Sequence, residues 1–212
     1  MKELLESLNE NFDDAEGWVR LVDANWFEDD LKLNLSIQFH DGREPEMWEI
    51  SCLGVVEESL CSIGAEALSV SNDSPLLKPF LEPVVDIMFS KNAVAPETLF
   101  GIVCSCCMEV MGRPESIVRF MNAAPTIKGI SSSNYGLLGR FPESLAKHIL
   151  EALKDKPVCT NALPGHLPTR WDGSKHVGYG KLQVLEFGRS YIVADQFGAS
   201  RVQQKSDDSS CR

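Results

Sequence analysis

The sequence lacks the long apolar runs that mark membrane-spanning or exported chains. Its longest apolar stretch, residues 99–108, contains Ser105 and ends before Glu109, so it falls well short of the roughly 20 apolar residues needed to cross a bilayer. The N-terminus carries Glu3 and Glu6 where a secretory signal has an uninterrupted apolar segment. These absences predict a cytoplasmic protein without a membrane span.

Paired cysteine spacings are lacking as well. The seven cysteines are an odd number without the spacing of a disulfide framework, so we expect free thiols in a reducing cytosol. In the cluster Cys104-Ser105-Cys106-Cys107, Cys104 and Cys107 would share one helical face and could hold zinc together with Cys159 or a histidine. A structural zinc site normally shows two paired spacings, and the neighbours here are those of a buried helix, in which cysteine acts as a small apolar residue. No metal and no cofactor are predicted.

Basic residues are scarce in the first third of the chain. Residues 1–73 contain 18 Asp and Glu and only 4 Lys and Arg, whereas residues 74–212 contain 13 acidic and 16 basic residues. Like charges gathered in one region repel one another, which favours a surface that meets a cationic partner. The same charge argues against direct binding to nucleic acid or to an anionic membrane. A basic protein partner is therefore predicted.

The length of 212 residues and the 43% hydrophobic content are enough for a folded core. Residues 2–12 have the apolar spacing of a helix, and residues 31–39 alternate apolar with polar side chains as a strand does. Further strands are expected at 18–23 and 47–53, and Asp41-Gly42 favours a hairpin between the second and third strands. The later expected elements are a kinked helix or two short helices at 76–89, helices at 96–111 and 142–154, an irregular segment at 157–180, and strands at 182–187, 191–197 and 200–203.

This order predicts an α+β fold. The N-terminal meander and the C-terminal hairpin would join one antiparallel or mixed sheet, with the helices packed on one face. We expect a single domain over residues 1–204 and a disordered polar tail over 205–212.

Two further segments and one possible pairing of side chains suggest chemistry without specifying it. Residues 129–136 are rich in glycine and serine and could present backbone amides to an anion, but they lack the lysine and glycine spacing of a phosphate loop, which favours an ordinary loop. Residues 165–181 are basic and aromatic, and the sequence favours a role in closing the loop over binding a base. A cysteine nucleophile paired with His148, His166 or His176 has no recognisable nucleophile turn, so no catalytic residue is assigned.

The first third carries a resemblance to a class of known proteins. The segment 21–26 (LVDANW) leads into 31–35 (LKLNL) and then 47–52 (MWEISC), and this pattern resembles the openings of bacterial immunity proteins from polymorphic toxin systems. The resemblance implies a small, acidic, cytosolic protein that binds a cognate toxin domain and blocks its active site or its substrate docking. Many such toxins act on nucleic acids and are basic, which suits the acidic surplus.

The resulting hypothesis is a non-enzymatic inhibitor that occludes a basic toxin domain. Acidic side chains would steer the partner and tryptophans would anchor it. The predicted partner-binding residues are Trp26, Glu28, Asp29, Asp30, Asp41, Glu44, Glu46 and Trp48. Two alternatives stay open: an adaptor or secretion chaperone for a basic client, and a small enzyme that uses Cys159 and His166 between the 157–180 segment and the helical middle.

Overall fold

The computed structural model describes residues 1–12, 17–113, 117–121 and 135–202. They form two compact units: unit 1 comprises Met1–Ser74 and the segment from Gly180 onward, and unit 2 comprises Pro75–Tyr179. Each unit has its own cluster of buried apolar residues. The sequence predicted a single domain over 1–204 and did not reveal this division. The predicted disordered tail, 205–212, lies outside the described residues.

Unit 1 is a six-stranded antiparallel sheet with one helix. The strands follow the order β1-β2-β3-β11-β10-β4, so the predicted joining of the N-terminal meander to the C-terminal hairpin is confirmed. The α+β class is confirmed with it. Of the third C-terminal strand expected at 200–203, residues 200–201 are instead the end of β11. The elements are α1 (Lys2–Phe12), β1 (Gly17–Phe27), β2 (Asp30–Phe39), β3 (Glu46–Ser59), β4 (Leu68–Ser71), β10 (Gln183–Phe187) and β11 (Ser190–Arg201).

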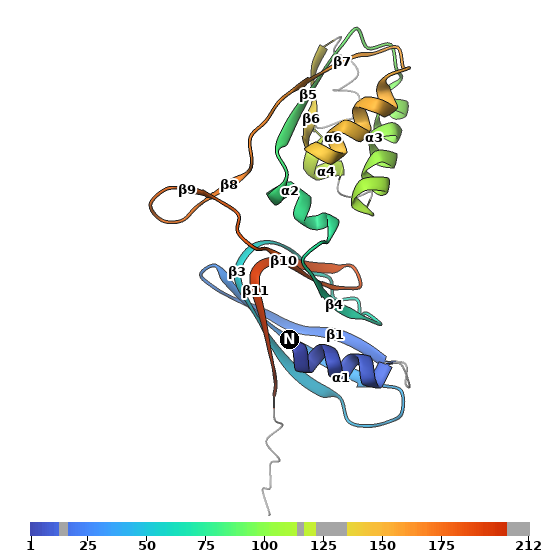
Figure 1. Ribbon diagram of the computed structural model, residues 1–212. Helices are drawn as coiled ribbons and strands as arrows, with labels where there is room; N and C mark the ends of the chain where they lie inside the picture. The colour runs from blue at the N-terminus through green and yellow to red at the C-terminus, as the bar shows by residue number, and fades with distance from the viewer. Residues whose placement is uncertain (13–16, 114–116, 122–134, 203–212) are drawn as a thin grey trace, which may run out of the picture. The chain divides into compact units, whose positions relative to one another are not determined.

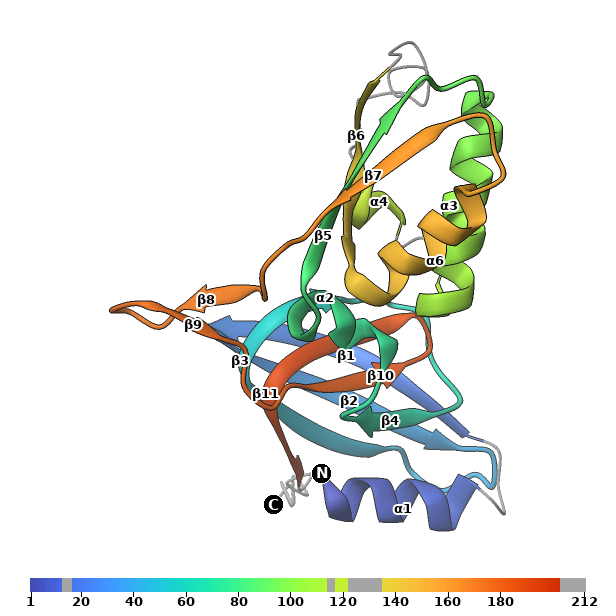
Figure 2. The ribbon, with the colours of Figure 1, turned by 45° about the horizontal axis from the view of Figure 1, so that its top comes forward.

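The alternating pattern of β2 places the core of unit 1. Leu31, Leu33 and Leu35 are fully buried, because the period of two in a strand sends every second side chain to the same face. Leu4 and Leu8 of α1 belong to the same cluster, and Figure 2 shows α1 lying along one side of this sheet. The helical spacing seen in the sequence thus matches a helix that covers the apolar face.

The two edges of this sheet approach each other at one point. Val19 of β1 exchanges backbone hydrogen bonds of 2.7 and 2.8 Å with Ala65, in the segment that leads into β4. The Cys61 N–H donates to Ser190 Oγ at 2.9 Å, and the Ser190 hydroxyl donates back to the Cys61 carbonyl at 3.3 Å. The sheet is therefore curled so that the first half of β1 is covered at Val19.

Unit 2 is a three-stranded antiparallel sheet, β6-β5-β7, packed with helices. The predicted helix at 96–111 is confirmed as α3, which begins at Pro96 and ends at Met111. The next residue, Gly112, has a φ of +71°, a conformation that favours glycine. The helix expected at 142–154 is confirmed as α6. The elements are η1 (Pro75–Leu77), α2 (Lys78–Leu81), β5 (Val84–Ser90), α3 (Pro96–Met111), α4 (Ile117–Phe120), β6 (Tyr135–Pro142), α6 (Glu143–Leu153), β7 (Cys159–Leu163), β8 (Thr169–Trp171) and β9 (His176–Gly178).

Two predictions for the middle of the chain are wrong. The helical pattern over 76–89 ends at Leu81, and the residues after Pro83 form the strand β5. A short apolar run without alternation does not distinguish a strand from a buried helix. The segment 157–180, predicted to be irregular, contains β7 and the small hairpin β8–β9, which Figure 1 shows in orange as a loop leading away from β7. None of the helices over the described ranges is long and apolar enough to cross a membrane.

Candidate functional site

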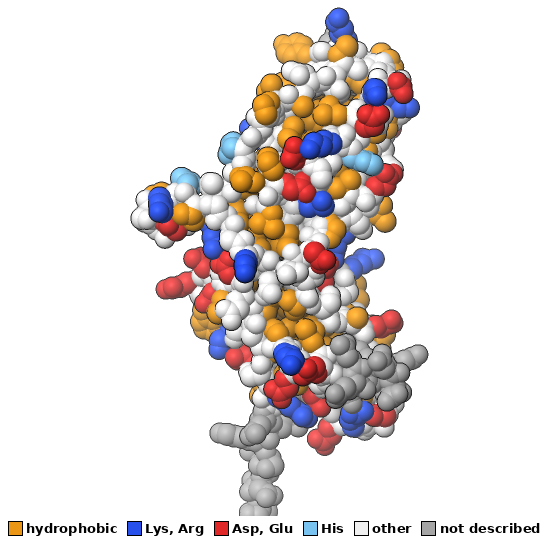
Figure 3. Space-filling model, in the orientation of Figure 1, with side chains coloured by type: hydrophobic (Ala, Val, Ile, Leu, Met, Phe, Trp, Pro, Cys, Tyr) orange, Lys and Arg blue, Asp and Glu red, His pale blue; other side chains and the backbone are white. Residues whose placement is uncertain are grey.

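The charge asymmetry of the sequence follows the division into units. Residues 1–74 and 180–212 contain 22 acidic and 9 basic residues, a net of -13, and residues 75–179 contain 9 acidic and 11 basic residues, a net of +2. The acidic surplus therefore belongs to unit 1. On the face drawn in Figure 3, acidic side chains gather with hydrophobic ones at the left-hand edge of unit 1.

The predicted acidic residues do not form one surface. Glu28 and Asp29 make the turn between β1 and β2, whereas Asp41 and Glu44 lie in the link between β2 and β3. These links are at opposite ends of the ten-residue strand β2, and at about 3.3 Å per residue they are separated by roughly 30 Å. We call the first group the turn acids (Glu28, Asp29 and Asp30) and the second the link acids (Asp41, Glu44 and Glu46).

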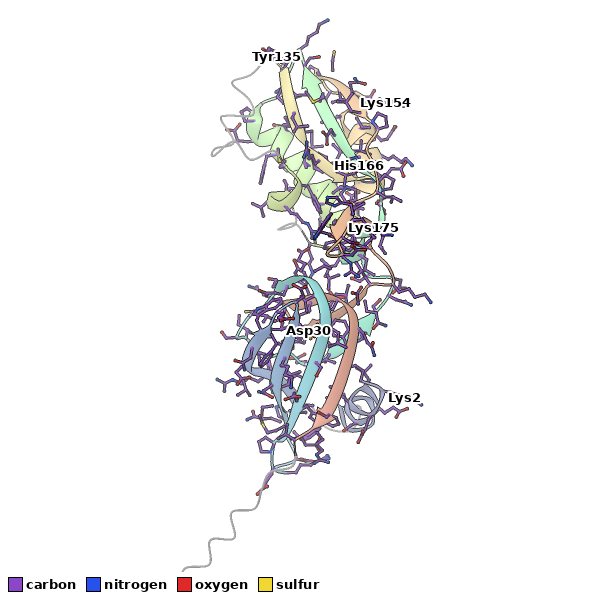
Figure 4. The ribbon with its side chains drawn as sticks, turned by 90° about the vertical axis from the view of Figure 1, so that its left-hand side faces the viewer. Lys2, Asp30, Tyr135, Lys154, His166 and Lys175 are labelled. Atoms are coloured by element: carbon purple, nitrogen blue, oxygen red, sulfur yellow. The ribbon has the colours of Figure 1, made fainter. Side chains whose placement is uncertain are left out.

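The turn acids are held by β3. The Gly54 N–H donates to Asp30 Oδ1 at 2.8 Å, and the Val55 N–H donates to the Asp29 carbonyl oxygen at 2.9 Å. Glu28 has a φ of +55°, a region that costs non-glycine residues energy. Asp30 thus has a structural partner, while the side chains of Glu28 and Asp29 are exposed. Figure 4 labels Asp30 at the sheet of unit 1.

The end of β1 presents two aromatic side chains beside these acids. Trp26 is 50% exposed and Phe27 is 57% exposed. Trp26 pairs with Leu31 and Phe27 pairs with Asp30, so the two rings lie on opposite faces of the strand. The Lys32 Nζ lies 5.8 Å from the centre of the Phe27 ring. Trp26 therefore extends the apolar face of the sheet to the surface.

The second half of β1 is an open edge. A register irregularity separates Leu21 from Asp23, and all residues from Val22 to Phe27 are exposed. Across the described part of the chain, β1 pairs with β2 along its length and, on its other side, with Ala65 at Val19. Residues 22–27, which we call the open edge, thus combine an unpaired strand backbone with exposed apolar side chains.

The link acids are in a different environment. Asp41 Oδ2 lies 2.6 Å from Arg43 Nη2, and hydrogen bonds from Arg43 lower the pKa of Asp41. Glu46 accepts a hydrogen bond of 3.1 Å from Trp48 Nε1 and pairs with Arg201 at 2.9 Å. Glu46 is therefore committed within the fold.

Trp48 is only 2% exposed. Its side chain lies in the core of unit 1, and its backbone pairs with that of Leu35. The prediction that Trp48 anchors a partner is wrong in this structure, because almost none of its surface is accessible. The predicted partner contacts that stay exposed on unit 1 are Trp26, Glu28 and Asp29 at one end and Asp41 and Glu44 at the other.

The cysteines show little sign of an activated nucleophile. Burial, the largest cause, raises the pKa of both Cys52 and Cys107 to about 12, and it also raises the pKa of Cys106. Such thiols remain protonated and unreactive at neutral pH. The described Cys104 and Cys107 belong to no group of three or more His, Cys, Asp or Glu that could hold a metal ion.

Cys159 and His166, the pair considered for catalysis, lie at opposite ends of the sheet of unit 2. Cys159 pairs with Ser90 at one end of β5, whereas the His166 carbonyl accepts the N–H of Val84 at the other end. The six-residue step along β5 corresponds to roughly 20 Å. Figure 4 labels Tyr135, which also pairs with Ser90, and His166 at opposite ends of this sheet.

Another histidine has a carboxylate partner. His148 Nε2 lies 2.6 Å from Glu109 Oε2, and the Ser105 hydroxyl donates to Glu109 Oε1 at 3.3 Å. Hydrogen bonds from His148, the largest cause, and from Ser105 lower the pKa of Glu109. The carboxylate stands between the imidazole and the hydroxyl, so the imidazole does not contact the group it would have to deprotonate.

The basic and aromatic segment 165–181 is only partly packed. The Tyr179 ring lies edge-on to Phe80 with 5.2 Å between the ring centres, and the Arg170 guanidinium lies 5.7 Å from the centre of the Tyr179 ring. Trp171 is 60% exposed, so the prediction that the segment closes on the fold is met by Tyr179 and not by Trp171. Of the loop 129–136, residues 129–134 lie outside the described residues, and 135–136 begin β6.

Comparisons with protein-family models, with curated proteins and with solved structures found no match to this chain. The candidate site therefore rests on the geometry of unit 1 alone. Its defining residues are the exposed turn acids Glu28 and Asp29 and the open edge with Trp26 and Phe27. Sequence reasoning singled out Trp26 and the acids, and it missed the strand edge because edge position depends on the strand order.

Proposed function

We propose that this protein is a binding protein that holds a basic protein partner at the end of unit 1 formed by the open edge and the turn acids. In this proposal it acts as an immunity protein, and the bound partner is a toxin domain whose active or substrate-docking surface becomes covered. The observation that carries the proposal is the exposure of Trp26 and Phe27 directly beside Glu28 and Asp29.

The two kinds of residue would contribute differently. Aromatic side chains at the centre of an interface commonly carry much of its affinity, and truncating one often costs about 2 kcal/mol or more. Carboxylates at the rim contribute less to affinity, but they speed the encounter with a basic surface. The net charge of -13 over the residues of unit 1 favours such steering, and it disfavours an acidic partner.

The arrangement of the reactive groups supports a binding role over catalysis. Cys159 and His166 are separated by the length of β5, and the buried Cys52 and Cys107 have pKa values of about 12. The exposed Glu109 and His148 pair binds a serine through the carboxylate and not through the imidazole. None of these groups forms a nucleophile with an adjacent base.

The proposal is tested by capture and neutralisation. The tagged full chain is used as bait for basic proteins at low and at high salt, and a captured domain is then expressed with and without the chain to measure its toxicity. We expect capture that weakens with salt and suppression of toxicity by the wild type. Trp26→Ala should abolish suppression, whereas Trp171→Ala, which removes a somewhat more exposed tryptophan from unit 2, should leave it intact.

Two results would contradict the proposal. Equal loss with Trp26→Ala and Trp171→Ala would mean that the end of unit 1 is not the docking site. Capture of a basic partner without any neutralisation would identify an adaptor or secretion chaperone instead of an inhibitor.

A further inference from the structure

We propose that the open edge, residues 22–27, takes up one extended segment of the basic partner as a seventh strand of the sheet. This inference rests on the proposed function, since it specifies how the same partner binds. Strand addition of this kind obtains affinity from main-chain hydrogen bonds and specificity from alternate side chains. The occupant is a cationic polypeptide segment in extended conformation.

The open edge has only part of the usual protection of a strand edge. Natural sheets shield their edges with short strands, prolines, charged side chains, β-bulges or covering segments, and here only Asp23 and the irregularity between Leu21 and Asp23 are of this kind. The other edge of this sheet, β4, has only four residues, and the first half of β1 is covered by Ala65 at Val19. The open edge contains neither lysine nor proline, and its six residues span roughly 20 Å, the length of an ordinary strand.

The side chains of the open edge specify the pattern of the incoming strand. Ala24 pairs with Leu33 and Trp26 with Leu31, so both lie on the face of the sheet that carries the core. Asp23, Asn25 and Phe27 lie on the opposite face. An added strand would therefore place apolar residues next to Trp26 on one face and cationic residues near Asp23 on the other.

Charge decides between a foreign strand and a second copy of this chain. Pairing two copies through the open edge would bring together two units that each carry a net charge of -13. Asp23, Glu28 and Asp29 are exposed at or next to the edge, and like charges facing each other across strands are destabilising. A basic strand relieves this repulsion, which a second acidic unit would increase.

The test uses two peptides and the full chain. The first is a capped eight-residue peptide of alternating lysine and valine. The second has the same sequence with the backbone nitrogen methylated at alternate residues, so its charge and side chains are unchanged but one hydrogen-bonding edge is lost. Binding is followed by amide chemical shifts of the labelled chain and by hydrogen exchange at residues 20–30.

We expect the first peptide to slow amide exchange within residues 22–27 and to bind at least about tenfold more tightly than the methylated peptide, because several backbone hydrogen bonds are lost on methylation. The double variant Glu28→Gln/Asp29→Asn should weaken both peptides while keeping the ratio between them. This ratio isolates strand pairing from charge attraction.

Equal affinity of the two peptides, or no binding of either at about 1 mM, a weak affinity, would overturn the inference. Protection of residues 22–27 in the chain alone, together with self-association in sedimentation, would show that a second copy is the occupant and would overturn it as well. The peptide test does not involve a toxin. If the chain fails to neutralise a toxin but still binds the unmethylated peptide more tightly than the methylated one, the proposed function alone is refuted. If the chain neutralises a toxin but binds the two peptides with equal affinity, strand pairing alone is refuted.

Discussion

The Gly54 N–H donates a hydrogen bond of 2.8 Å to Asp30 Oδ1 and so fastens the β1–β2 turn to β3. Gly54 has a φ of +62°, and the carboxylate of Asp195 occupies the space that a side chain at Gly54 would need. The turn that carries Glu28 and Asp29 is therefore held in place before any partner binds. Preorganisation of this kind lowers the conformational cost of binding.

Substitutions at Asp30 test this fastening. Asp30→Ala leaves the Gly54 N–H without its acceptor and should lower the free energy of unfolding of unit 1 by about 1–2 kcal/mol. Asp30→Asn keeps an acceptor oxygen and should cost clearly less. Urea unfolding followed by tryptophan fluorescence suits the measurement, because three of the four tryptophans, Trp18, Trp26 and Trp48, belong to unit 1. Equal stability of the alanine variant and the wild type would show that the bond contributes nothing.

The protein should be more stable with glycine at position 28 than with alanine. Its φ of +55° disfavours residues with a Cβ by roughly 1–2 kcal/mol, and glycine adopts this conformation without that cost. Both substitutions remove the carboxylate, so they differ mainly in backbone strain. We expect the free energy of unfolding of Glu28→Gly to exceed that of Glu28→Ala by about 1 kcal/mol in the same assay. An alanine variant as stable as the glycine variant would mean that the turn relaxes without strain.

The stability of unit 2 should depend on the ionisation of Glu82. Burial alone would raise the pKa of this carboxyl, but hydrogen bonds from the Ser144 N–H, Lys78 and the Ser144 hydroxyl outweigh burial and lower it. A lowered pKa in the folded state gives stability that is present above the unfolded value of 4.5 and is lost as the pH falls through the folded value.

Glu82→Gln should therefore destabilise unit 2 near neutral pH and have a smaller effect near pH 3. Because Glu82 is only partly buried, with 24% of its side chain exposed, we expect a difference of about 1 kcal/mol or less. Urea unfolding followed by far-UV circular dichroism at several pH values measures it. A difference between variant and wild type that does not change with pH would contradict the role of the charged carboxylate.

The thiols should differ sharply in reactivity. Cys159 is exposed, whereas Cys52, Cys106 and Cys107 are buried, and burial raises the pKa values of these three thiols. Iodoacetamide at mildly alkaline pH, with peptide mapping by mass spectrometry, should modify Cys159 quickly and these three only after unfolding. If Cys107 were modified as fast as Cys159 in the folded protein, the buried position of the Cys107 side chain on α3 would be contradicted. Alkylation should also leave partner capture unchanged, since Cys159 lies in unit 2.

The sequence predicted the elements whose signals are local. The alternation from Leu31 to Phe39 matches β2, and Pro96 and Gly112 mark the two ends of α3. The strand β5 was missed because its residues alternate only weakly, with partly buried side chains on both faces. The division into two units was missed because the turn-rich stretches at 71–75 (SNDSP) and 178–180 (GYG) are as short as ordinary loops and do not by themselves mark a boundary between units.

The candidate site was predicted only in part, because its arrangement also depends on how the strands pair. Sequence proximity between residues 28 and 46 hides the fact that β2 separates the turn acids from the link acids by its whole length. The burial of Trp48 did have a signal: Trp48, Ile50 and Cys52 repeat with a period of two, and the hairpin register pairs them with Leu35, Leu33 and Leu31. The open edge had no signal in the sequence, because only the order of the strands in the sheet identifies β1 as an edge strand.

In the proposed function the turn acids, and not the link acids, meet the basic partner. The most direct test compares association rates of the captured partner domain with the wild type, with Glu28→Gln/Asp29→Asn and with Asp41→Asn/Glu44→Gln, each over a range of salt concentrations. The two double variants remove the same charge from opposite ends of β2. The first variant should slow association and flatten its salt dependence, while the second should resemble the wild type. Equal slowing by both variants, or slowing by the second alone, would contradict this expectation.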